Sequence, residues 1–415
     1  MNFREITPQE IQSSLINIRQ ITFEVTDACN LQCKYCGYGD LYFGYDKRES
    51  NYMTFTQAKS IIDYLANLWN SNKAASYKAR TYFSFYGGEP LLNMPLIMLI
   101  VEYIESIKLN RNIIYSMTTN AMLLDRYMEY LVNKKFHLLI SLDGNKESQS
   151  YRVTKNGANS FDTVYKNVKN LQEQYPRYFA ECVNFNSVLH NRSTVEGVYS
   201  FVKTEFGKEP TISELNNSGI RGDKKAEFDL VYRNKEESLR NSENYEKLSQ
   251  ELFMSEPNTS NLLTYIHQYS GNVYKDYNSL FIDKSKLQYT PTGTCTPFSK
   301  KMFITVNGKI LQCERIDHNF ALGQITDNGV ILDLDVITKK FNGYINRLKK
   351  QCELCFRNES CIQCLYYIPD VDSEDAICNG FMDEDIFKNY SMYCLGHLAR
   401  HPYLYEKLMN DIMVD

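Results

Sequence analysis

Six short apolar runs recur along the first half of the chain, and each is followed by a longer amphipathic stretch. The runs are rich in β-branched and aromatic residues and predict strands at 21–25, 82–86, 113–118, 137–142, 183–189 and 210–216. Their apolar character is continuous rather than alternating, which is typical of strands buried on both faces. Because strands alternate with helical stretches, the pattern predicts βα units, a parallel sheet and an α/β fold.

The stretches between the runs place apolar residues at helical spacing. The first follows a predicted capping box of Thr54 and Gln57, and the others lie at 96–107, 124–132, 161–171 and 195–206. Six βα repeats are too few to close a full barrel of eight. The sequence therefore predicts a partial (β/α)6 TIM-like barrel that stays open.

The rest of the chain changes character twice. After residue 217 it turns polar and charged, with a helical stretch near 262–269, and from residue 291 it becomes dense in cysteine. A chain of 415 residues exceeds what one core normally fills, so we expect more than one domain. The predicted parts are an N-terminal extension 1–20, the barrel 21–217, a connecting helical segment 218–290, a cysteine-rich domain 291–395 and a closing helix 396–415.

Charge and hydropathy exclude several classes of protein. The chain carries 46 Lys and Arg against 50 Asp and Glu, which gives no electrostatic reason to expect a nucleic acid partner. The first twenty residues lack the apolar core of a signal peptide. The longest apolar run, Pro95 to Val101, is too short to span a bilayer. We therefore expect a cytoplasmic protein with neither nucleic acid nor membrane as partner.

The twelve cysteines fall into two groups. Cys29, Cys33 and Cys36 lie directly after the first predicted strand, and eight more lie between residues 295 and 394. Only Cys182 stands apart, inside an apolar strand, where we expect an inert core thiol. The cytoplasm keeps thiols reduced, so metal binding is a better explanation of both groups than disulfides.

The spacing of the first group suits an open iron-sulfur cluster. Three thiolates on one loop can hold three irons of a cubane and leave the fourth iron without a protein ligand. A structural zinc site would need four ligands, and no fourth His or Cys lies near Cys29, Cys33 and Cys36. An open iron can bind a small chelating molecule.

Two motifs together resemble the radical S-adenosylmethionine (radical SAM) superfamily. One is the cysteine spacing in EVTDACNLQCKYCGYG, and the other is Gly87-Gly88-Glu89-Pro90 after the second strand, which alone would indicate only a turn. The resemblance implies a [4Fe-4S] cluster whose open iron binds the amine and carboxylate of S-adenosylmethionine. It also implies that the backbone of Gly87 and Gly88 approaches the methionyl amine and that the backbone of Tyr35 contacts the adenine.

Further cofactor contacts are expected at the ends of the later strands, where barrel folds build their sites. The resemblance implies that Ser141 and Arg152 bind the ribose and carboxylate regions of the cofactor and that Leu189 packs on the adenine. Asn120 and Asp143 complete the set. The alternatives are a turn or helix cap for Asn120 and Asp143, and a surface arginine for Arg152.

The second cysteine group resembles the SPASM extension of radical SAM enzymes that modify peptides and proteins. The resemblance implies two auxiliary [4Fe-4S] clusters, an outer one on Cys352, Cys355, Cys361 and Cys378 and an inner one on Cys295, Cys313 and Cys364. Cys394 would be the fourth inner ligand or an outer alternative. The chain departs from the common pattern by two rather than three residues before Cys364 and by one additional cysteine. Zinc ribbons remain the alternative for the two Cys-x2-Cys pairs.

Glu314 follows Cys313 directly. In sulfatase-maturing relatives an aspartate follows the equivalent cysteine and acts as a base, and here a glutamate takes that position. The sequence leaves a structural salt bridge and a catalytic general base equally open. A carboxylate beside an anionic cluster is expected to have a raised pKa.

The resemblance implies an enzyme that cleaves S-adenosylmethionine reductively and uses the resulting 5'-deoxyadenosyl radical, with a flavodoxin or ferredoxin as electron donor. We expect the substrate to be a ribosomally made precursor peptide whose side chains are oxidised and crosslinked. A separate leader-binding protein or the segment 217–289 would recognise its leader. The alternatives are an anaerobic sulfatase-maturing enzyme that forms formylglycine and a non-catalytic iron-sulfur electron-transfer protein, although the GGEP and SLDG motifs argue against the latter.

Overall fold

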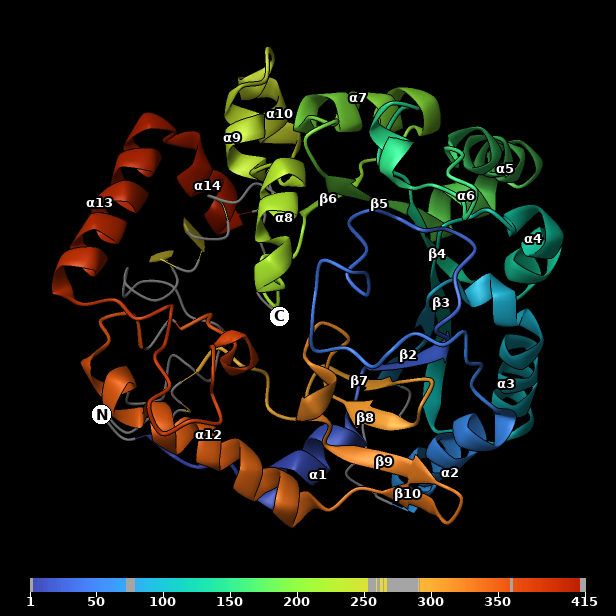
Figure 1. The fold of residues 1–415 in the computed structure, drawn as a ribbon, viewed down its shortest axis with the longest axis horizontal. Helices are drawn as coiled ribbons and strands as arrows, with labels where there is room; N and C mark the ends of the chain where they lie inside the picture. The colour runs from blue at the N-terminus through green and yellow to red at the C-terminus, as the bar shows by residue number, and fades with distance from the viewer. Residues whose placement is uncertain are drawn as a thin grey trace. The chain divides into compact units, whose positions relative to one another are not determined.

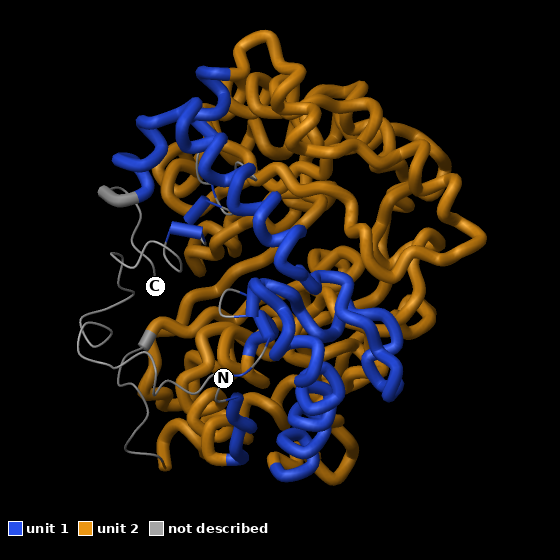
Figure 2. The backbone as a smooth tube through the Cα atoms, turned by 90° about the vertical axis from the view of Figure 1, so that its left-hand side faces the viewer, with its two compact units in different colours: residues 1–8, 246–295, 335–415 blue, residues 9–245, 296–334 orange. Residues whose placement is uncertain are grey.

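The computed structural model describes residues 3–71, 79–252, 259, 262–263, 265–266, 290, 292–358 and 361–410. The chain forms two compact units (Figure 2). The larger unit comprises residues 9–245 and 296–334, and the smaller unit comprises residues 1–8, 246–295 and 335–415. Among the described residues, no helix has both the length and the apolar character needed to cross a bilayer.

The larger unit is built on a ten-stranded sheet in the order β10-β9-β8-β7-β1-β2-β3-β4-β5-β6 (Figure 1). Six of these strands are parallel neighbours in chain order: β1 (Gln20–Thr26), β2 (Ala79–Gly87), β3 (Arg111–Thr119), β4 (His137–Ser141), β5 (Val183–Leu189) and β6 (Thr211–Glu214). All six strands predicted from the sequence are therefore confirmed. Strand β6 lies at one edge of the sheet, so the barrel is partial and open as predicted.

Helices link successive strands and line the outer side of the sheet (Figure 1). Those that the sequence predicted are α2 (Phe55–Ser71), α3 (Met94–Ser106), α4 (Leu124–Asn133), α5 (Phe161–Gln174) and α7 (Val195–Phe206). The capping box before α2 is confirmed, because the Thr54 N–H donates to Gln57 Oε1 at 2.8 Å and the Gln57 N–H donates to Thr54 Oγ1 at 3.3 Å.

Two further helices precede strands and were not predicted, α1 (Pro8–Ile16) and α6 (Pro176–Cys182). Cys182 therefore ends a helix, and its placement inside a strand was wrong, because the extended conformation begins at Val183. The thiol is 8% exposed, and burial raises its pKa. Both observations agree with an inert core thiol.

The two faces of the strands differ, which corrects the expectation of continuous apolar strands. Outward side chains such as Phe23, Phe83 and Phe85 are at most 1% exposed and pack beneath the helices. Inward side chains on the same strands are polar, among them Thr22 and Ser84, although both are also buried. Since side chains alternate along a strand, polar side chains of β1 and β2 face the barrel interior while the layer under the helices is apolar.

Residues 296–334, which the sequence places with the cysteine-rich region, extend the barrel sheet. Strand β7 (Lys301–Ile304) runs parallel to β1, and β8 (Lys309–Leu311), β9 (Gly323–Thr326) and β10 (Gly329–Ile331) follow in antiparallel order. The turn between β7 and β8 ends at Gly308, whose φ of +79° favours glycine.

The connecting segment contains short α-helices among its described residues. It contains α8 (Lys225–Val231), α9 (Lys235–Arg240) and α10 (Tyr245–Glu251), whereas most of the stretch expected at 262–269 lies outside the described residues. The smaller unit contains most of α12 (Leu334–Leu354) and all of α13 (Glu384–Arg400) and α14 (Tyr403–Asn410). The predicted closing helix therefore corresponds to the end of α13 and to α14.

Candidate functional site

The loop after β1, residues 27–39, brings Cys29, Cys33 and Cys36 together and is called the cysteine loop below. The Cys36 N–H donates to the Cys33 carbonyl at 3.2 Å, and the Leu31 N–H donates to Cys29 Sγ at 3.4 Å. Burial raises the pKa of Cys29 to about 11 and that of Cys33 to about 12, and the neighbouring thiols add to both shifts. Three clustered thiolates need a positive partner here, which an iron cluster would provide.

Two glycines allow the end of β2 to dock on the start of this loop. A Cβ on Gly87 would lie 2.1 Å from the Thr26 carbonyl oxygen, and one on Gly88 would lie 2.0 Å from the Ala28 carbonyl oxygen. The Gly88 N–H donates to Thr26 and the Glu89 N–H donates to Ala28, each at 2.9 Å. A side chain at either glycine would therefore separate β2 from the cysteine loop. Their approach to the methionyl amine stays a prediction.

Glu89 joins the ends of β2 and β3. Its Oε1 accepts from the Thr119 hydroxyl at 2.6 Å and the Leu91 N–H at 3.1 Å, and its Oε2 accepts from the Asn120 N–H at 2.8 Å. The side chain is 1% exposed, and burial raises its pKa to about 7 although these hydrogen bonds oppose the shift. The buried Glu89 side chain thus holds the ends of β2 and β3 together by hydrogen bonds.

Asn120 reaches from the end of β3 to the cysteine loop. Its amide donates to Asn30 Oδ1 at 2.8 Å and lies 3.8 Å from Cys29 Sγ, while its Oδ1 accepts from the Met122 N–H at 3.0 Å. Asn120 therefore caps a turn, as the alternative predicted, and it also lies beside a candidate cluster ligand. A direct contact of Asn120 with the cofactor stays a prediction.

Asp143 and Arg152 pair with each other beneath Tyr35. Arg152 Nε and Nη2 donate to Asp143 Oδ2 and Oδ1 at 3.0 and 2.9 Å, and the Tyr35 hydroxyl donates to the same carboxylate. Asp143 is fully buried and Arg152 is 7% exposed, so Arg152 is not a surface arginine. Burial alone would lower the pKa of Arg152, but the charge of Asp143 raises it. Direct cofactor contacts by Tyr35, Asp143 and Arg152 stay predictions.

His190 belongs to this group and was missed from the sequence. Its Nε2 lies 2.9 Å from the Ser148 carbonyl oxygen and 3.8 Å from Asp143 Oδ2, and its ring stacks on Tyr35 with centroids 5.5 Å apart. The only sequence signal is its position directly after β5. Ser141 and Leu189 end β4 and β5 as expected and are 9% and 0% exposed.

Glu314 forms the salt bridge that the sequence left open. Its carboxylate oxygens lie 3.0 and 3.1 Å from Lys301 Nζ on β7. Burial by itself would raise the pKa of Glu314, but the charge of Lys301, the hydrogen bonds to the carboxylate and the charge of Arg315 together lower it. The rise expected beside an anionic cluster stays a prediction, and the sequence did not show that β7 places a lysine opposite Glu314. A role for Glu314 as a general base stays a prediction.

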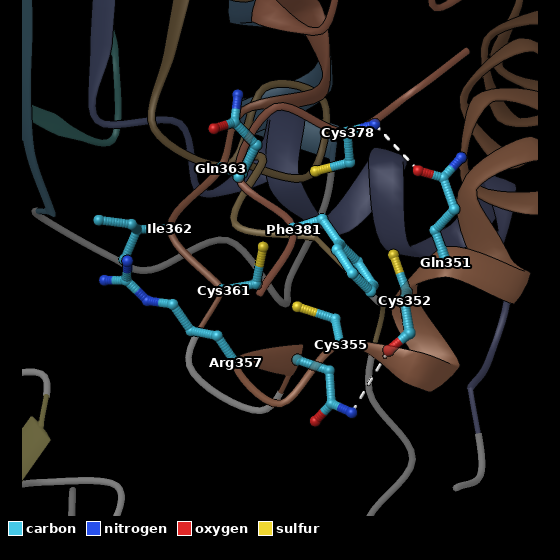
Figure 3. A pocket seen from close by; sticks show the side chains of 11 residues that line it. Gln351, Cys352, Cys355, Arg357, Cys361, Ile362, Gln363, Cys378 and Phe381 are labelled. Atoms are coloured by element: carbon cyan, nitrogen blue, oxygen red, sulfur yellow. Dashed lines mark hydrogen bonds between the residues drawn. The ribbon is translucent and has the colours of Figure 1, made fainter. Parts of the chain in front are cut away.

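Four cysteines of the smaller unit line one cavity of about 150 Å³, the four-cysteine pocket: Cys352, Cys355, Cys361 and Cys378. Figure 3 shows their sulfur atoms around this space. Burial raises the pKa of Cys352 to about 12, and the other three thiols add to the shift. These are the four residues that the resemblance assigns to the outer cluster. Among the described residues, no three His, Cys, Asp or Glu side chains are arranged to hold a single metal ion.

The remaining cysteines lie in three places. Cys295 and Cys364 are neighbours in the smaller unit, where the charge of Cys295 adds to the effect of burial in raising the pKa of Cys364. Cys313 belongs to the larger unit, next to Glu314. Cys394 is 1% exposed in an apolar cluster with Leu262, Ile266, Leu404 and Leu408, and it does not line the four-cysteine pocket.

Comparison with known proteins identifies the class of domain to which this sheet and cysteine loop belong. Residues 23–203 match the model of the radical SAM superfamily. This range begins in β1, ends in α7 and contains the three clustered cysteines and Glu89. The chain therefore carries a radical SAM domain, as its motifs predicted.

Curated relatives match part of the chain. A radical SAM cyclopropyl synthase of Paramaledivibacter caminithermalis is 28% identical over 204 residues, which are 48% of this chain and 40% of the relative. A cysteine-type anaerobic sulfatase-maturating enzyme of Clostridium novyi is 27% identical over 182 residues, which are 43% of this chain and 46% of the relative. An uncharacterized protein of Methanocaldococcus jannaschii is 36% identical over 149 residues, 35% of this chain and 46% of the relative. The chain thus spans less than half the length of these relatives.

Solved structures extend the likeness in fold. Native anSMEcpe with bound AdoMet and Cp18Cys peptide has a TM-score of 0.61 at 18% identity, covering 95% of this chain and 99% of that chain. Native anSMEcpe with bound AdoMet has a TM-score of 0.56 at 17% identity, covering 94% and 99%. At this low identity the likeness establishes the fold, and it extends beyond the radical SAM domain into the cysteine-rich C-terminal region.

Proposed function

We propose that this chain is a radical SAM peptide maturase. It would oxidise side chains of a ribosomally synthesised precursor peptide and crosslink them. The observation that carries the proposal is the combination of a cysteine loop braced by the ends of β2 to β5 with a separate four-cysteine pocket. An enzyme that only generates a radical needs the cysteine loop. An enzyme that oxidises its substrate also needs an acceptor for a further electron.

The cysteine loop is the proposed holder of the catalytic cluster. Cys29, Cys33 and Cys36 would ligate three irons of a [4Fe-4S] cluster, and S-adenosylmethionine would bind the fourth. When bound, these groups would supply a 5'-deoxyadenosyl radical that removes a hydrogen atom from the substrate. The protein contributes position: Glu89 holds the ends of β2 and β3 together, and the buried pair of Asp143 and Arg152 holds Tyr35.

The four-cysteine pocket is the proposed site of an auxiliary [4Fe-4S] cluster. Its volume of about 150 Å³ is about ten times the 10–15 Å³ that a single water requires, so it has room for a polynuclear group. The raised pKa of Cys352, caused by burial first and by the adjacent thiols second, also favours a cationic occupant. We propose Cys295, Cys313 and Cys364 as ligands of a second auxiliary cluster.

The proposed reaction needs an electron donor and a means of recognising the peptide. A one-electron donor such as a flavodoxin or ferredoxin would reduce the catalytic cluster. A separate leader-binding protein or the segment 217–289 would recognise the leader of the peptide. We place the reaction in the cytoplasm, because reduced cysteines and a reducible cluster need a reducing compartment.

The test is anaerobic incubation with S-adenosylmethionine, a reductant and the peptide encoded beside the gene. Each crosslink should lower the peptide mass by about 2 Da, because two hydrogens leave, and 5'-deoxyadenosine should form alongside. Mass spectrometry measures both. An unmodified peptide, or a modification without loss of mass such as epimerisation, would contradict the proposed oxidation.

Sulfatase maturation is the second candidate, favoured by one observation. The sulfatase-maturating relative of Clostridium novyi and the anSMEcpe structures resemble this chain in sequence and in fold, respectively. Incubation with a peptide containing the sulfatase cysteine would test it. Formylglycine in that peptide, together with an unmodified neighbour-encoded peptide, would select this candidate.

A further inference from the structure

A chamber of about 400 Å³ lies in the larger unit, and inward side chains of the barrel strands line it. Among the lining residues, Thr22 on β1, Ser84 on β2 and Ser116 on β3 carry hydroxyl groups side by side on adjacent strands. Thr22 is in register with Ser84, and Ser84 is in register with Ser116. The sheet therefore presents a row of three hydroxyls to one space, which we call the polar chamber.

The hydrogen bonds of this row leave one serine proton free. Gln20 Nε2 donates to Ser84 Oγ at 2.8 Å, and the Ser84 and Ser116 hydroxyls share one bond of 2.6 Å. If Ser84 donates to Ser116, the Ser116 proton is free, and if Ser116 donates, the Ser84 proton is free. In both cases one serine O–H is available to an acceptor in the chamber.

Thr22 supplies a second free hydroxyl. The residue is 5% exposed, and within the part of the chain that the structure describes its Oγ1 is buried without a hydrogen-bond partner. A buried polar group normally has a partner, since desolvation without one is unfavourable. The unpaired Thr22 hydroxyl at the wall of a chamber therefore points to a ligand with hydrogen-bonding groups.

The charges at the chamber wall cancel each other. Lys301 and Glu314 both line it and form the ion pair described above. An ionised guest would meet one charge of its own sign and find the opposite charge already paired, so it would lose hydration without gaining a free counter-ion. An uncharged guest avoids this penalty.

We propose that the polar chamber binds an uncharged, hydrogen-bonding side chain of the peptide, that of Ser, Thr, Asn or Gln. Thr22 and the Ser84–Ser116 pair determine this specificity. Each candidate side chain carries an acceptor oxygen for the free serine proton and a donor for Thr22 Oγ1. The inference rests on the proposed function in taking the ligand to be a peptide.

The test measures binding without turnover. The cluster-loaded full-length protein with S-adenosylmethionine is equilibrated by dialysis against labelled peptides Ac-Gly-Gly-X-Gly-Gly-NH2, in which X is Asn, Ser, Leu, Asp or Lys. The Asn and Ser peptides should bind about fivefold or more tighter than the other three, which corresponds to one net hydrogen bond. Equal or tighter binding of the Leu, Asp or Lys peptide overturns the proposal, and so does absence of binding by all five.

Amino-acid substitutions test which side chains cause the tighter binding of the Asn peptide. Thr22→Val and the double variant Ser84→Ala/Ser116→Ala should each reduce the advantage of the Asn peptide over the Leu peptide by about fivefold. Both serines are replaced because either one alone would keep a free O–H. The matched control is Thr81→Val, because the Thr81 hydroxyl on β2 is likewise buried without a partner among the described residues but does not line the chamber. A preference that survives Thr22→Val and Ser84→Ala/Ser116→Ala, or that disappears in Thr81→Val, refutes the assignment. Failure of the neighbour-encoded peptide to react would leave this binding result intact and would count against the proposed function alone.

Discussion

Asp143 and Arg152 form a two-point ion pair in the interior of the barrel, with Nε–Oδ2 and Nη2–Oδ1 distances of 3.0 and 2.9 Å. The same carboxylate accepts from the Tyr35 hydroxyl and from the Val188 N–H. One buried carboxylate thereby connects the cysteine loop, the end of β4 and the end of β5. Because the loop holds the three candidate cluster ligands, their positions depend on this pair.

Removing the charge of Asp143 should destabilise the fold. Asp143→Asn leaves the buried Arg152 guanidinium without a counter-ion, and breaking a buried pair costs about 3–5 kcal/mol in the free energy of unfolding. Urea unfolding measures this loss. The control is Asp162→Asn, since Asp162 pairs with Lys146 at the surface, with side chains 70% and 60% exposed. Equal stability of the two variants would show that Asp143 does not anchor the site.

Iron content should report the three proposed clusters. Anaerobic reconstitution should load about 12 irons per chain, and Cys355→Ala should lower this by up to about 4, because each cubane holds four. Cys394→Ala should keep the full load, since Cys394 packs in an apolar cluster away from the four-cysteine pocket. Stoichiometric zinc with only one cluster would contradict the auxiliary-cluster proposal.

Cleavage of S-adenosylmethionine should depend on the cysteine loop alone. Replacing Cys29, Cys33 and Cys36 by Ala should abolish 5'-deoxyadenosine formation, because no iron remains to donate the electron. Cys355→Ala should retain some uncoupled cleavage but form no modified peptide. Chromatographic measurement of 5'-deoxyadenosine decides, and unchanged cleavage by the triple variant would disprove the cluster assignment.

Glu89 should make the metal-free protein less stable as the pH rises. Burial raises its pKa from 4.5 to about 7, so between these values the folded state binds more protons than the unfolded state, and stability falls with increasing pH. The full effect is about 3 kcal/mol, from about 1.4 kcal/mol per pKa unit.

Urea unfolding between pH 4.5 and 8 measures this dependence. Glu89→Gln should remove that part of the slope, while also weakening the hydrogen bond that the Asn120 N–H donates. Glu129→Gln, on the exposed side of α4, should leave the slope unchanged. The same slope in wild type and Glu89→Gln would assign the effect to another group.

Glu314→Gln separates the two roles of Glu314. If Glu314 accepts a proton from the substrate, the variant should retain 5'-deoxyadenosine formation and lose product by about 100-fold or more, which is typical of general-base removal. Lys301→Met breaks the same ion pair but keeps the carboxylate, and it should lose less product. Full product formation by Glu314→Gln would show that Glu314 is not a general base and acts only in the salt bridge.

The sequence alone determined the elements of the barrel and the cluster motif. Strands such as Ile21–Val25 and the capping box at Thr54 and Gln57 depend on local conformational preferences and on side chains a few residues apart. The three cysteines after β1 are likewise contiguous, so their spacing could be interpreted without knowledge of the fold. Local signals of this kind survive in the linear sequence because the interacting groups are neighbours along the chain.

Tertiary structure decided which distant residues meet. The polar inner face was hidden because Thr22, Ser84 and Ser116 are separated by about sixty and thirty residues and meet only through strand register. The pairing of Glu314 with Lys301 and of His190 with Tyr35 depends equally on register and on loop packing. Cys394 shows the same limit, since the sequence does not reveal that α13 and α14 bury it among apolar side chains. Spacing defines which groups are available, and long-range packing defines their partners.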